Sequence, residues 1–355
     1  MWVRLNSDIF DDKSNLRDVR QLITFAFEGS RDINIIKIKL LAEYDKVKDT
    51  ELFQELDSID QDLLISIFVD SYYRDDVEAK YNVTNNGNIS NNFTLEEAKE
   101  LFKESFSIVL ENSKNDSPFV KAILHHFASD KAFINHAIDK RWITFEHAGG
   151  SSSVVNFIKG KLNPFLSLSS KNNASPYKYF RGIVIVDSDK KYPEAPENGT
   201  TKSIRTYLSE QNIPLHVLNK RSMENYIPDE TILNVRQQKN SSKRTEDKKC
   251  VKWINVYEHL NPKIKDFLKY EGISESDFST GDLNNLFLDI GQNQRDILIQ
   301  GINYKNFELE EDEINFKNSF PLLFSTCNLV NKMTLNDRCG SNELQDLSTK
   351  INELL

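Results

Sequence analysis

The stretch that most constrains the fold of this chain is RGIVIVDSD, residues 181–189. Its continuous run of β-branched residues predicts a strand that is covered on both faces, as in a parallel sheet. In open α/β sheets, ligands bind just beyond the carboxyl ends of such strands. Asp187 and Asp189 follow this strand directly, so we expect them at a ligand-binding edge. Two carboxylates there suit a hard divalent cation such as Mg²⁺, which is bound through oxygen and shared with phosphate.

The sequence around this stretch alternates between strand-like and helix-like segments. Short apolar segments at 106–110, 141–148, 181–186 and 214–218 predict strands, and the helical patterns at 117–130, 154–162 and 201–211 lie between them. This alternation predicts an α/β fold with a four-stranded parallel core sheet and right-handed crossovers. The polar stretch 163–180 is expected to be a loop.

Three units are expected along the chain. Residues 1–93 predict a mainly helical or mixed α+β module that ends in an Asn-rich linker at 82–93. Residues 94–230 form the sheet unit, which opens with a capping box of Thr94 and Glu97. Residues 231–355 predict a second, mainly helical module, and the charged stretch 237–249 is expected to be an exposed loop.

The net charge of −9 hides an uneven distribution. Residues 111–250 carry 22 Lys and Arg against 15 Asp and Glu, a net charge of +7, whereas residues 1–110 carry −9 and residues 251–355 carry −7. A basic surface around a carboxylate cluster is what a metal-dependent enzyme acting on a polyanion requires. The alternative is that the charges serve docking between domains.

Composition also indicates the compartment. Cys250, Cys327 and Cys339 are scattered, without a Cys-x-x-Cys pair, which is typical of free thiols in a reducing compartment. No apolar run approaches the roughly 20 residues that span a membrane, and the N-terminus is too acidic for a signal peptide. We therefore expect a cytoplasmic protein without membrane contact.

Glu111 follows the first predicted strand of the sheet unit, as Asp187 and Asp189 follow the third. Together with the segments IVLENSKNDSPFVKAIL, EHAGGSSSVVNFI, RGIVIVDSD and HVLNKRSMENYIP, this pattern resembles the Toprim domain of topoisomerases, bacterial primases and the overcoming-lysogenization-defect (OLD) nucleases. The second acid, Asp116, and the basic pair followed by Glu-Asn-Tyr resemble the OLD type. The resemblance covers about residues 106–230.

This resemblance implies a metal-dependent endonuclease that uses one or two Mg²⁺ or Mn²⁺ ions. Two such ions can activate a water molecule and stabilise the leaving oxygen of a phosphodiester. We assign Glu111, Asp187 and Asp189 to the first ion, and Asp116 and Glu224 are candidates for the second. Either Lys220 or Lys269 is expected to neutralise the phosphate or to protonate the leaving group.

Several of these residues also have a structural interpretation. Glu111 and Asp116 could be acids that lead a helix, which its dipole favours. Glu224 could pair with Arg221. The junction at 149–150, two glycines before a helix, could be a plain tight turn or could cradle a phosphate.

The resemblance further implies partners. The chain has no G-x-x-x-x-G-K-[ST] motif, so an ATPase subunit would act in trans, as in anti-phage defence systems, and nucleic acid would be the substrate. A homo-oligomer is compatible with the sequence. Two competing hypotheses are a non-catalytic Toprim-like scaffold that binds an ATPase or nucleic acid, and a glycosyl- or nucleotidyltransferase that uses Asp-x-Asp to hold a metal diphosphate.

Overall fold

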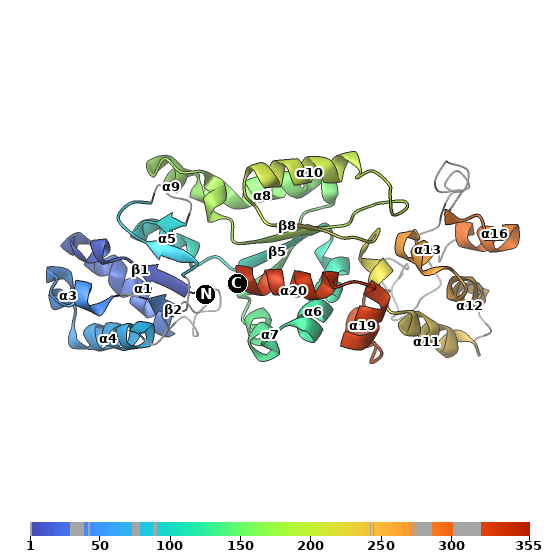
Figure 1. The fold of residues 1–355 in the computed structure, drawn as a ribbon, viewed down its shortest axis with the longest axis horizontal. Helices are drawn as coiled ribbons and strands as arrows, with labels where there is room; N and C mark the ends of the chain where they lie inside the picture. Colours follow the sequence, from blue (N-terminus) through green and yellow to red (C-terminus); the bar gives the residue numbers. More distant parts are fainter. Residues whose placement is uncertain are drawn as a thin grey trace.

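The computed structural model describes residues 2–28, 39–41, 43–72, 79–87, 91–241, 243, 245–270, 273, 286–300 and 321–355. These residues form a mixed α/β structure with two four-stranded sheets, and all the strand pairs in both sheets are parallel. Figure 1 shows the N-terminal sheet at one end of the molecule, the second sheet in the middle and a group of helices at the other end.

The central sheet confirms the predicted four-stranded parallel core. Its strands are β5 (Phe106–Leu110), β6 (Ile143–His147), β7 (Gly182–Val186) and β8 (Leu215–Val217). They are ordered β6-β5-β7-β8, so β5 and β7 lie side by side in the middle. Each lies within a segment for which the sequence predicts a strand, and the signal is strongest for β7, whose IVIV run is β-branched and buried.

Helices cover both faces of the central sheet (Figure 1). On one face, α6 (Ser113–Phe127), α7 (Lys131–Asp139) and α20 (Glu343–Leu354) pack against Ile108 and Ile185. On the other, α8 (Val154–Leu162) and α10 (Gly199–Glu210) pack against Val109 and Val184. Side chains alternate between the two faces of a strand, so a continuous apolar run fills both cores.

The first residue of β7 has to be glycine. Gly182 pairs with Ser107 of β5, and a Cβ atom at position 182 would lie 2.1 Å from the carbonyl oxygen of Ser107. No side chain fits at that separation. The glycine of RGIVIV therefore allows the two central strands to approach each other at the start of their pairing.

The N-terminal segment contains a four-stranded sheet beside its helices, where the sequence left a mainly helical or a mixed α+β module open. Its strands are β1 (Trp2–Leu5), β2 (Lys39–Leu41), β3 (Tyr81–Val83) and β4 (Asn92–Phe93), in the order β2-β1-β3-β4. Strands of two to four residues are too short to show a period-two pattern, and two of them lie in or beside the Asn-rich stretch that predicted a linker. The helices here are α1 (Leu16–Glu28), α2 (Tyr44–Val47), α3 (Glu51–Glu55), α4 (Ser58–Tyr72) and α5 (Leu95–Leu101).

The N-terminal sheet and the central unit share a core rather than being joined by a free linker. The Phe93 ring packs edge-on against Tyr179, which stacks on Phe165 at 4.9 Å between centroids. Glu97, fully buried in α5, accepts hydrogen bonds from the Tyr179 hydroxyl and the Lys178 ammonium. The predicted capping box of Thr94 and Glu97 is also present, so Glu97 joins the two units.

The remaining described helices are α9 (Leu166–Lys171), within the predicted loop 163–180, and a C-terminal set: α11 (Asp229–Lys239), α12 (Thr245–Glu258), α13 (Pro262–Phe267), α16 (Gln292–Gln300), α18 (Leu323–Thr326) and α19 (Lys332–Cys339). The loop expected at 237–249 is shorter than predicted, because α11 runs to Lys239 and α12 begins at Thr245. Burial of Ile232, Val235 and Trp253 holds both helices despite their polar surfaces.

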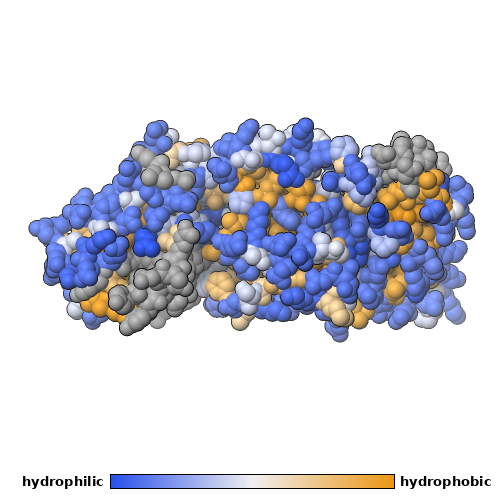
Figure 2. Space-filling view, in the orientation of Figure 1, coloured by the Kyte–Doolittle hydropathy of each residue, from blue (hydrophilic) through white to orange (hydrophobic). Residues whose placement is uncertain are grey.

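The face of the molecule in Figure 2 is largely hydrophilic, with apolar areas over the middle and the right-hand end and a smaller one at the lower left. Ile59, Ile65 and Val69 of α4 are exposed. No helix in the described part of the chain is long and apolar enough to span a membrane.

Candidate functional site

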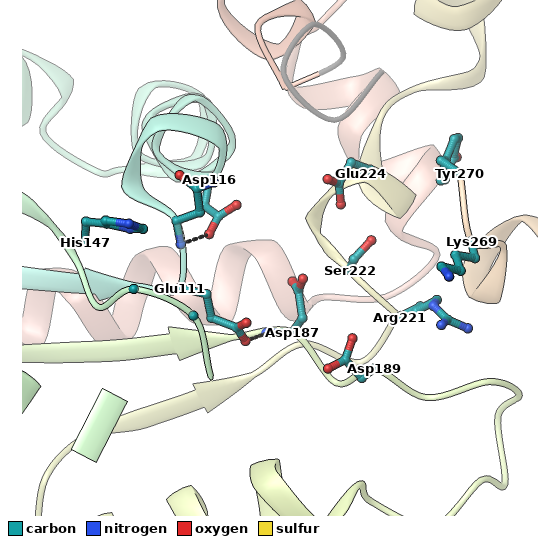
Figure 3. Close-up of a pocket in the computed structure, with 13 residues that line it drawn as sticks. Glu111, Asp116, His147, Asp187, Asp189, Arg221, Ser222, Glu224, Lys269 and Tyr270 are labelled. Carbon is teal, nitrogen blue, oxygen red and sulfur yellow. Dashed lines mark hydrogen bonds between the residues drawn. The ribbon is translucent and has the colours of Figure 1, made fainter. Parts of the chain in front are cut away.

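A pocket of about 420 Å³ opens at the carboxyl ends of the central strands (Figure 3). This is the edge at which open parallel sheets bind their ligands. The residues that line it come from five separate segments of the chain: Glu111, Asn112, Asp116, His147, Gly149, Gly150, Asp187, Asp189, Arg221, Ser222, Glu224, Lys269 and Tyr270.

Glu111 and Asp187 are brought together by the two middle strands. Each is the first residue after its strand, and β5 and β7 are direct neighbours. The backbone N–H of Asp187 donates a hydrogen bond to Oε1 of Glu111 over 3.1 Å. The N–H of Met223, at the start of the short 3₁₀ helix η6 (Met223–Tyr226), donates to Oδ1 of Asp187 over 3.2 Å. Each carboxylate therefore uses one oxygen to join neighbouring loops.

Asp189 is held in a left-handed backbone conformation, with φ = 52°. Such a conformation is uncommon for a residue with a side chain, and surrounding contacts have to maintain it. Here the Asp189 N–H donates to the carbonyl oxygen of Arg221 over 3.0 Å, and the side-chain amide of Asn198 donates to Oδ2 of Asp189 over 3.1 Å. The turn places the Asp189 carboxylate on the same opening as Asp187 (Figure 3).

Asp116 and Glu224 face this opening from two further elements (Figure 3). Asp116 lies in the first turn of α6, where its Oδ2 accepts the backbone N–H of Asn112 over 2.8 Å. It is thus a first-turn acid, as the structural interpretation expected, and it also lines the pocket. Glu224 lies in η6 and lines the pocket as well. Five carboxylates therefore surround one opening.

Asp187 is surrounded by the other four carboxylates of the pocket. Burial, followed by the charges of Glu224, Glu111, Asp116 and Asp189, raises the pKa of Asp187 well above its ordinary value. Burial and like charges both disfavour an ionised carboxyl group. A bound divalent cation would reverse this balance, because it would supply the opposite charge.

The donor set fits Mg²⁺ or Mn²⁺ by chemistry. All five carboxylates offer hard oxygen ligands, which these ions prefer. The negative charge around Asp187 also favours binding of a cation. As the side chains stand, no three His, Cys, Asp or Glu residues in the described ranges are grouped so that they could hold a metal ion. Binding would therefore require the carboxylates to rotate inward from the pocket wall.

The two candidate lysines have different surroundings. Lys269 is exposed and lines the pocket, with its ammonium group beside the Arg221 side chain (Figure 3). Lys220 is not among the pocket residues. Only 6% of its side chain is exposed, and its ammonium donates to Oδ1 of Asp266 and to the carbonyl oxygen of Arg338. Burial, and secondly the charge of Arg338, lower the pKa of Lys220. Its contacts are those of a structural residue behind the pocket.

Asn225 holds the segment before Lys269 against the pocket, whose other lining residues, apart from Tyr270, lie more than forty residues earlier in the chain. Its side-chain amide donates to the carbonyl oxygens of Lys265 (2.8 Å) and Leu268 (3.0 Å). The Arg221 N–H also donates to the carbonyl oxygen of Asp266 over 3.0 Å. The segment 265–268 is thereby fixed against the segment 221–225, and the next residue is Lys269. The Asn of the Glu-Asn-Tyr motif is therefore a clamp between these segments.

Other pocket residues were left open by the sequence, as the junction at 149–150 was, or had no assigned role. Gly149 and Gly150 have φ values of 83° and 97°, a conformation that favours glycine, and the Gly150 N–H donates to the carbonyl oxygen of Glu111 over 2.9 Å. His147 is the last residue of β6. The carboxyl ends of the predicted strands placed Glu111 in the site, and the same criterion would have found His147. Ser222 and Tyr270 had no sequence signal, because their position depends on contacts across the fold.

The chain was also compared with known proteins. No family model, curated protein or solved structure matches it.

Proposed function

We propose that this protein is a metal-dependent nuclease with a Toprim-type core, which hydrolyses phosphodiester bonds of nucleic acid. The observation that carries the proposal is the pocket at the carboxyl ends of β5 and β7. Five carboxylates line it, and Arg221 and Lys269 line the same pocket. An acidic group of this size suits cations, and the adjacent basic side chains suit a polyanion that passes over them.

The roles of the residues follow from their positions. Glu111, Asp187 and Asp189 would hold the first Mg²⁺ or Mn²⁺, and Asp116 and Glu224 would hold a second. The bound metal would supply charge stabilisation and an activated water molecule. Arg221 and Lys269 would orient the phosphodiester and offset its negative charge, and the Lys269 ammonium could donate a proton to the leaving oxygen. The contacts of Asp116 with the Asn112 N–H and of Asp187 with the Met223 N–H hold together the segments that carry these carboxylates, and the side chains would rotate from there toward the metal.

The competing hypotheses explain less of the pocket. A transferase that holds a metal diphosphate needs Asp187 and Asp189, but it gives no role to Glu111, Asp116 and Glu224 on the same opening. A non-catalytic scaffold gives no reason for keeping Asp187 among four other carboxylates, which raises its pKa and opposes folding of the ionised form. We include in the proposal a separate ATPase subunit that controls the nuclease in anti-phage defence, as the resemblance to OLD-type proteins implies.

The direct test is cleavage by the purified full-length chain. Supercoiled plasmid, single-stranded DNA and total tRNA would each be incubated with Mg²⁺, with Mn²⁺ or with EDTA. Asp187→Ala would be compared with Asp139→Asn, which alters an exposed carboxylate of α7 that does not line the pocket. We expect metal-dependent cleavage of one polymer, lost in Asp187→Ala and kept in Asp139→Asn. Should the chain fail to cut any substrate, alone or after co-purification with its host partners, the nuclease assignment would be rejected.

A further inference from the structure

Glu343, the first residue of α20, contacts the segment from which Arg221, Ser222 and Glu224 enter the pocket, although it lies more than a hundred residues after the last strand. It is 5% exposed. Its Oε1 accepts the backbone N–H of Asn219 over 2.8 Å and lies 3.1 Å from Nε2 of His216. Its Oε2 accepts the hydroxyl of Tyr226 over 2.5 Å. A buried carboxylate is costly unless it is hydrogen-bonded, and three donors surround this one.

These donors all belong to β8 or to the segment that follows it. Residues 218–222 form the β8–η6 loop, which connects the last strand to η6 and carries Arg221 and Ser222 into the pocket. Asn219 lies inside this loop, His216 lies before it and Tyr226 lies at the far end of η6. One carboxylate therefore holds both ends of the segment that supplies three pocket residues, since Glu224 lies in η6 as well.

The contacts continue from this loop to the metal-binding side of the pocket. The Tyr226 hydroxyl, besides donating to Glu343, accepts the backbone N–H of Lys220 over 3.1 Å. The Lys220 carbonyl oxygen accepts the Ser188 hydroxyl over 2.6 Å, between Asp187 and Asp189. The Met223 N–H donates to Asp187 itself. The path from Glu343 to Asp187 and Asp189 therefore consists of hydrogen bonds within the segments 187–189 and 219–226.

We infer that Glu343 is a positioning residue for the metal site: it fixes the β8–η6 loop and thereby the carboxylates of Asp187, Asp189 and Glu224. This inference rests on the proposed nuclease function. Residues that orient metal ligands typically change metal affinity or activity by about 10- to 100-fold when they are altered. A purely structural buried carboxylate would lower stability and leave metal binding unchanged.

The same helix offers a matched control. Lys350 of α20 donates to the carbonyl oxygen of Leu215, at the start of β8, over 2.8 Å. It thus connects the same helix to the same strand, but at the end away from the β8–η6 loop. Lys350→Met removes one contact between α20 and β8 without touching the path to Asp187.

The experiment compares the wild-type full-length protein with Glu343→Gln, Tyr226→Phe and Lys350→Met. Mn²⁺ affinity is measured by calorimetry, cleavage by kcat and KM, and folding by Tm. We expect Glu343→Gln and Tyr226→Phe to weaken Mn²⁺ binding and lower kcat by about tenfold or more with KM nearly unchanged. Lys350→Met should lower Tm and keep both values within about twofold. Tyr226→Phe decides the question alone if Glu343→Gln does not fold, because it keeps the ring that packs on Phe119.

Two other outcomes are informative in different ways. In the first, the wild-type protein cleaves, and Glu343→Gln and Tyr226→Phe bind Mn²⁺ as tightly as Lys350→Met does. This result would overturn the positioning role of Glu343 and would leave the nuclease proposal intact. A wild-type chain that neither binds Mn²⁺ nor cleaves would reject the proposed function, and the positioning role with it.

Discussion

The backbone N–H of Asp187 donates to Oε1 of Glu111 over 3.1 Å, so the two acidic residues that end neighbouring strands are joined directly. The contact engages one oxygen of Glu111 and the main chain of Asp187. The other oxygen of Glu111 and the carboxylate of Asp187 are on the pocket side (Figure 3). Glu111 therefore combines a structural role with a candidate ligand role, and substitution can separate the two.

Glu111→Gln should keep the structural role of this side chain and lose its role as a candidate metal ligand. The amide oxygen of glutamine still accepts the Asp187 N–H, but the side chain has no charge for a cation. We expect a Tm within about 2 °C of wild type and a loss of metal-dependent cleavage of about 100-fold or more. Thermal unfolding and cleavage assays check both values. Full activity of Glu111→Gln would remove Glu111 from the set of metal ligands.

Asp187→Asn should stabilise the metal-free protein at neutral pH. The pKa of Asp187 is raised in the folded chain by burial and by the neighbouring carboxylates. Its contribution to stability is therefore fully present below the pKa of the unfolded chain and is lost as the pH rises through the folded value. The neutral amide avoids this loss.

With EDTA present, we expect Tm of Asp187→Asn to exceed that of wild type by about 2 °C or more at pH 7–8, and the difference to shrink toward pH 4. Added Mn²⁺ should raise Tm of the wild type and leave Asp187→Asn almost unchanged, because binding to the folded state stabilises it. Asp139→Asn, which alters an exposed residue of α7, controls for loss of a surface charge. A metal-free Asp187→Asn that is less stable than wild type at pH 8 would contradict the electrostatic argument.

The central sheet was predictable because its sequence signal is local. The segments that form β5 and β7, FSIVL and GIVIV, are buried at all five positions and contain short apolar runs, and the acids that follow them lie at a sheet edge by geometry alone. The N-terminal sheet lacked such a signal. Its strands are two to four residues long, and the side chains that stabilise them, such as Phe93 against Tyr179, are partners from distant segments.

The candidate site was predictable to the same extent. Glu111, Asp187 and Asp189 directly follow strands, so chain order was enough to place them at one edge of the sheet, whereas Asp116 and Glu224 were grouped with them through the resemblance to OLD-type segments. The two lysines could not be distinguished in this way. Lys220 follows β8, as a pocket residue would, but its side chain turns to Asp266, and Lys269 enters the pocket only because Asn225 binds the segment before it.

The two lysines should therefore respond differently to loss of charge. Lys269→Met should lower cleavage by about 100-fold with an unchanged Tm, because Lys269 is exposed and lines the pocket. Lys220→Met should lower the free energy of unfolding by about 3 kcal/mol, because it removes a buried ammonium from Asp266 and from the Arg338 carbonyl oxygen. Denaturant unfolding and cleavage measured on the same preparations separate the effects. Retained stability in Lys220→Met together with lost cleavage would return the catalytic role to Lys220.

Gly182 and Gly160 provide a matched test of how the central sheet is built. Gly182→Ala places a Cβ where the Ser107 carbonyl oxygen lies 2.1 Å away, so β5 and β7 have to separate at the start of their pairing. Gly160 lies within α8, and a Cβ there meets nothing within 4 Å. In a helix, alanine is favoured over glycine by about 0.5–1 kcal/mol.

We expect Gly182→Ala to destabilise the protein by about 3 kcal/mol or more, the cost of overpacking in a rigid core, and Gly160→Ala to stabilise it slightly. Because β5 and β7 carry Glu111 and Asp187 at their carboxyl ends, any Gly182→Ala protein that folds should also bind Mn²⁺ more weakly than Gly160→Ala does. Denaturant unfolding and calorimetry check the two parts. A folded Gly182→Ala protein with wild-type stability would show that the two strands are not held at the close approach described above, and the shared edge of Glu111 and Asp187 would then need another cause.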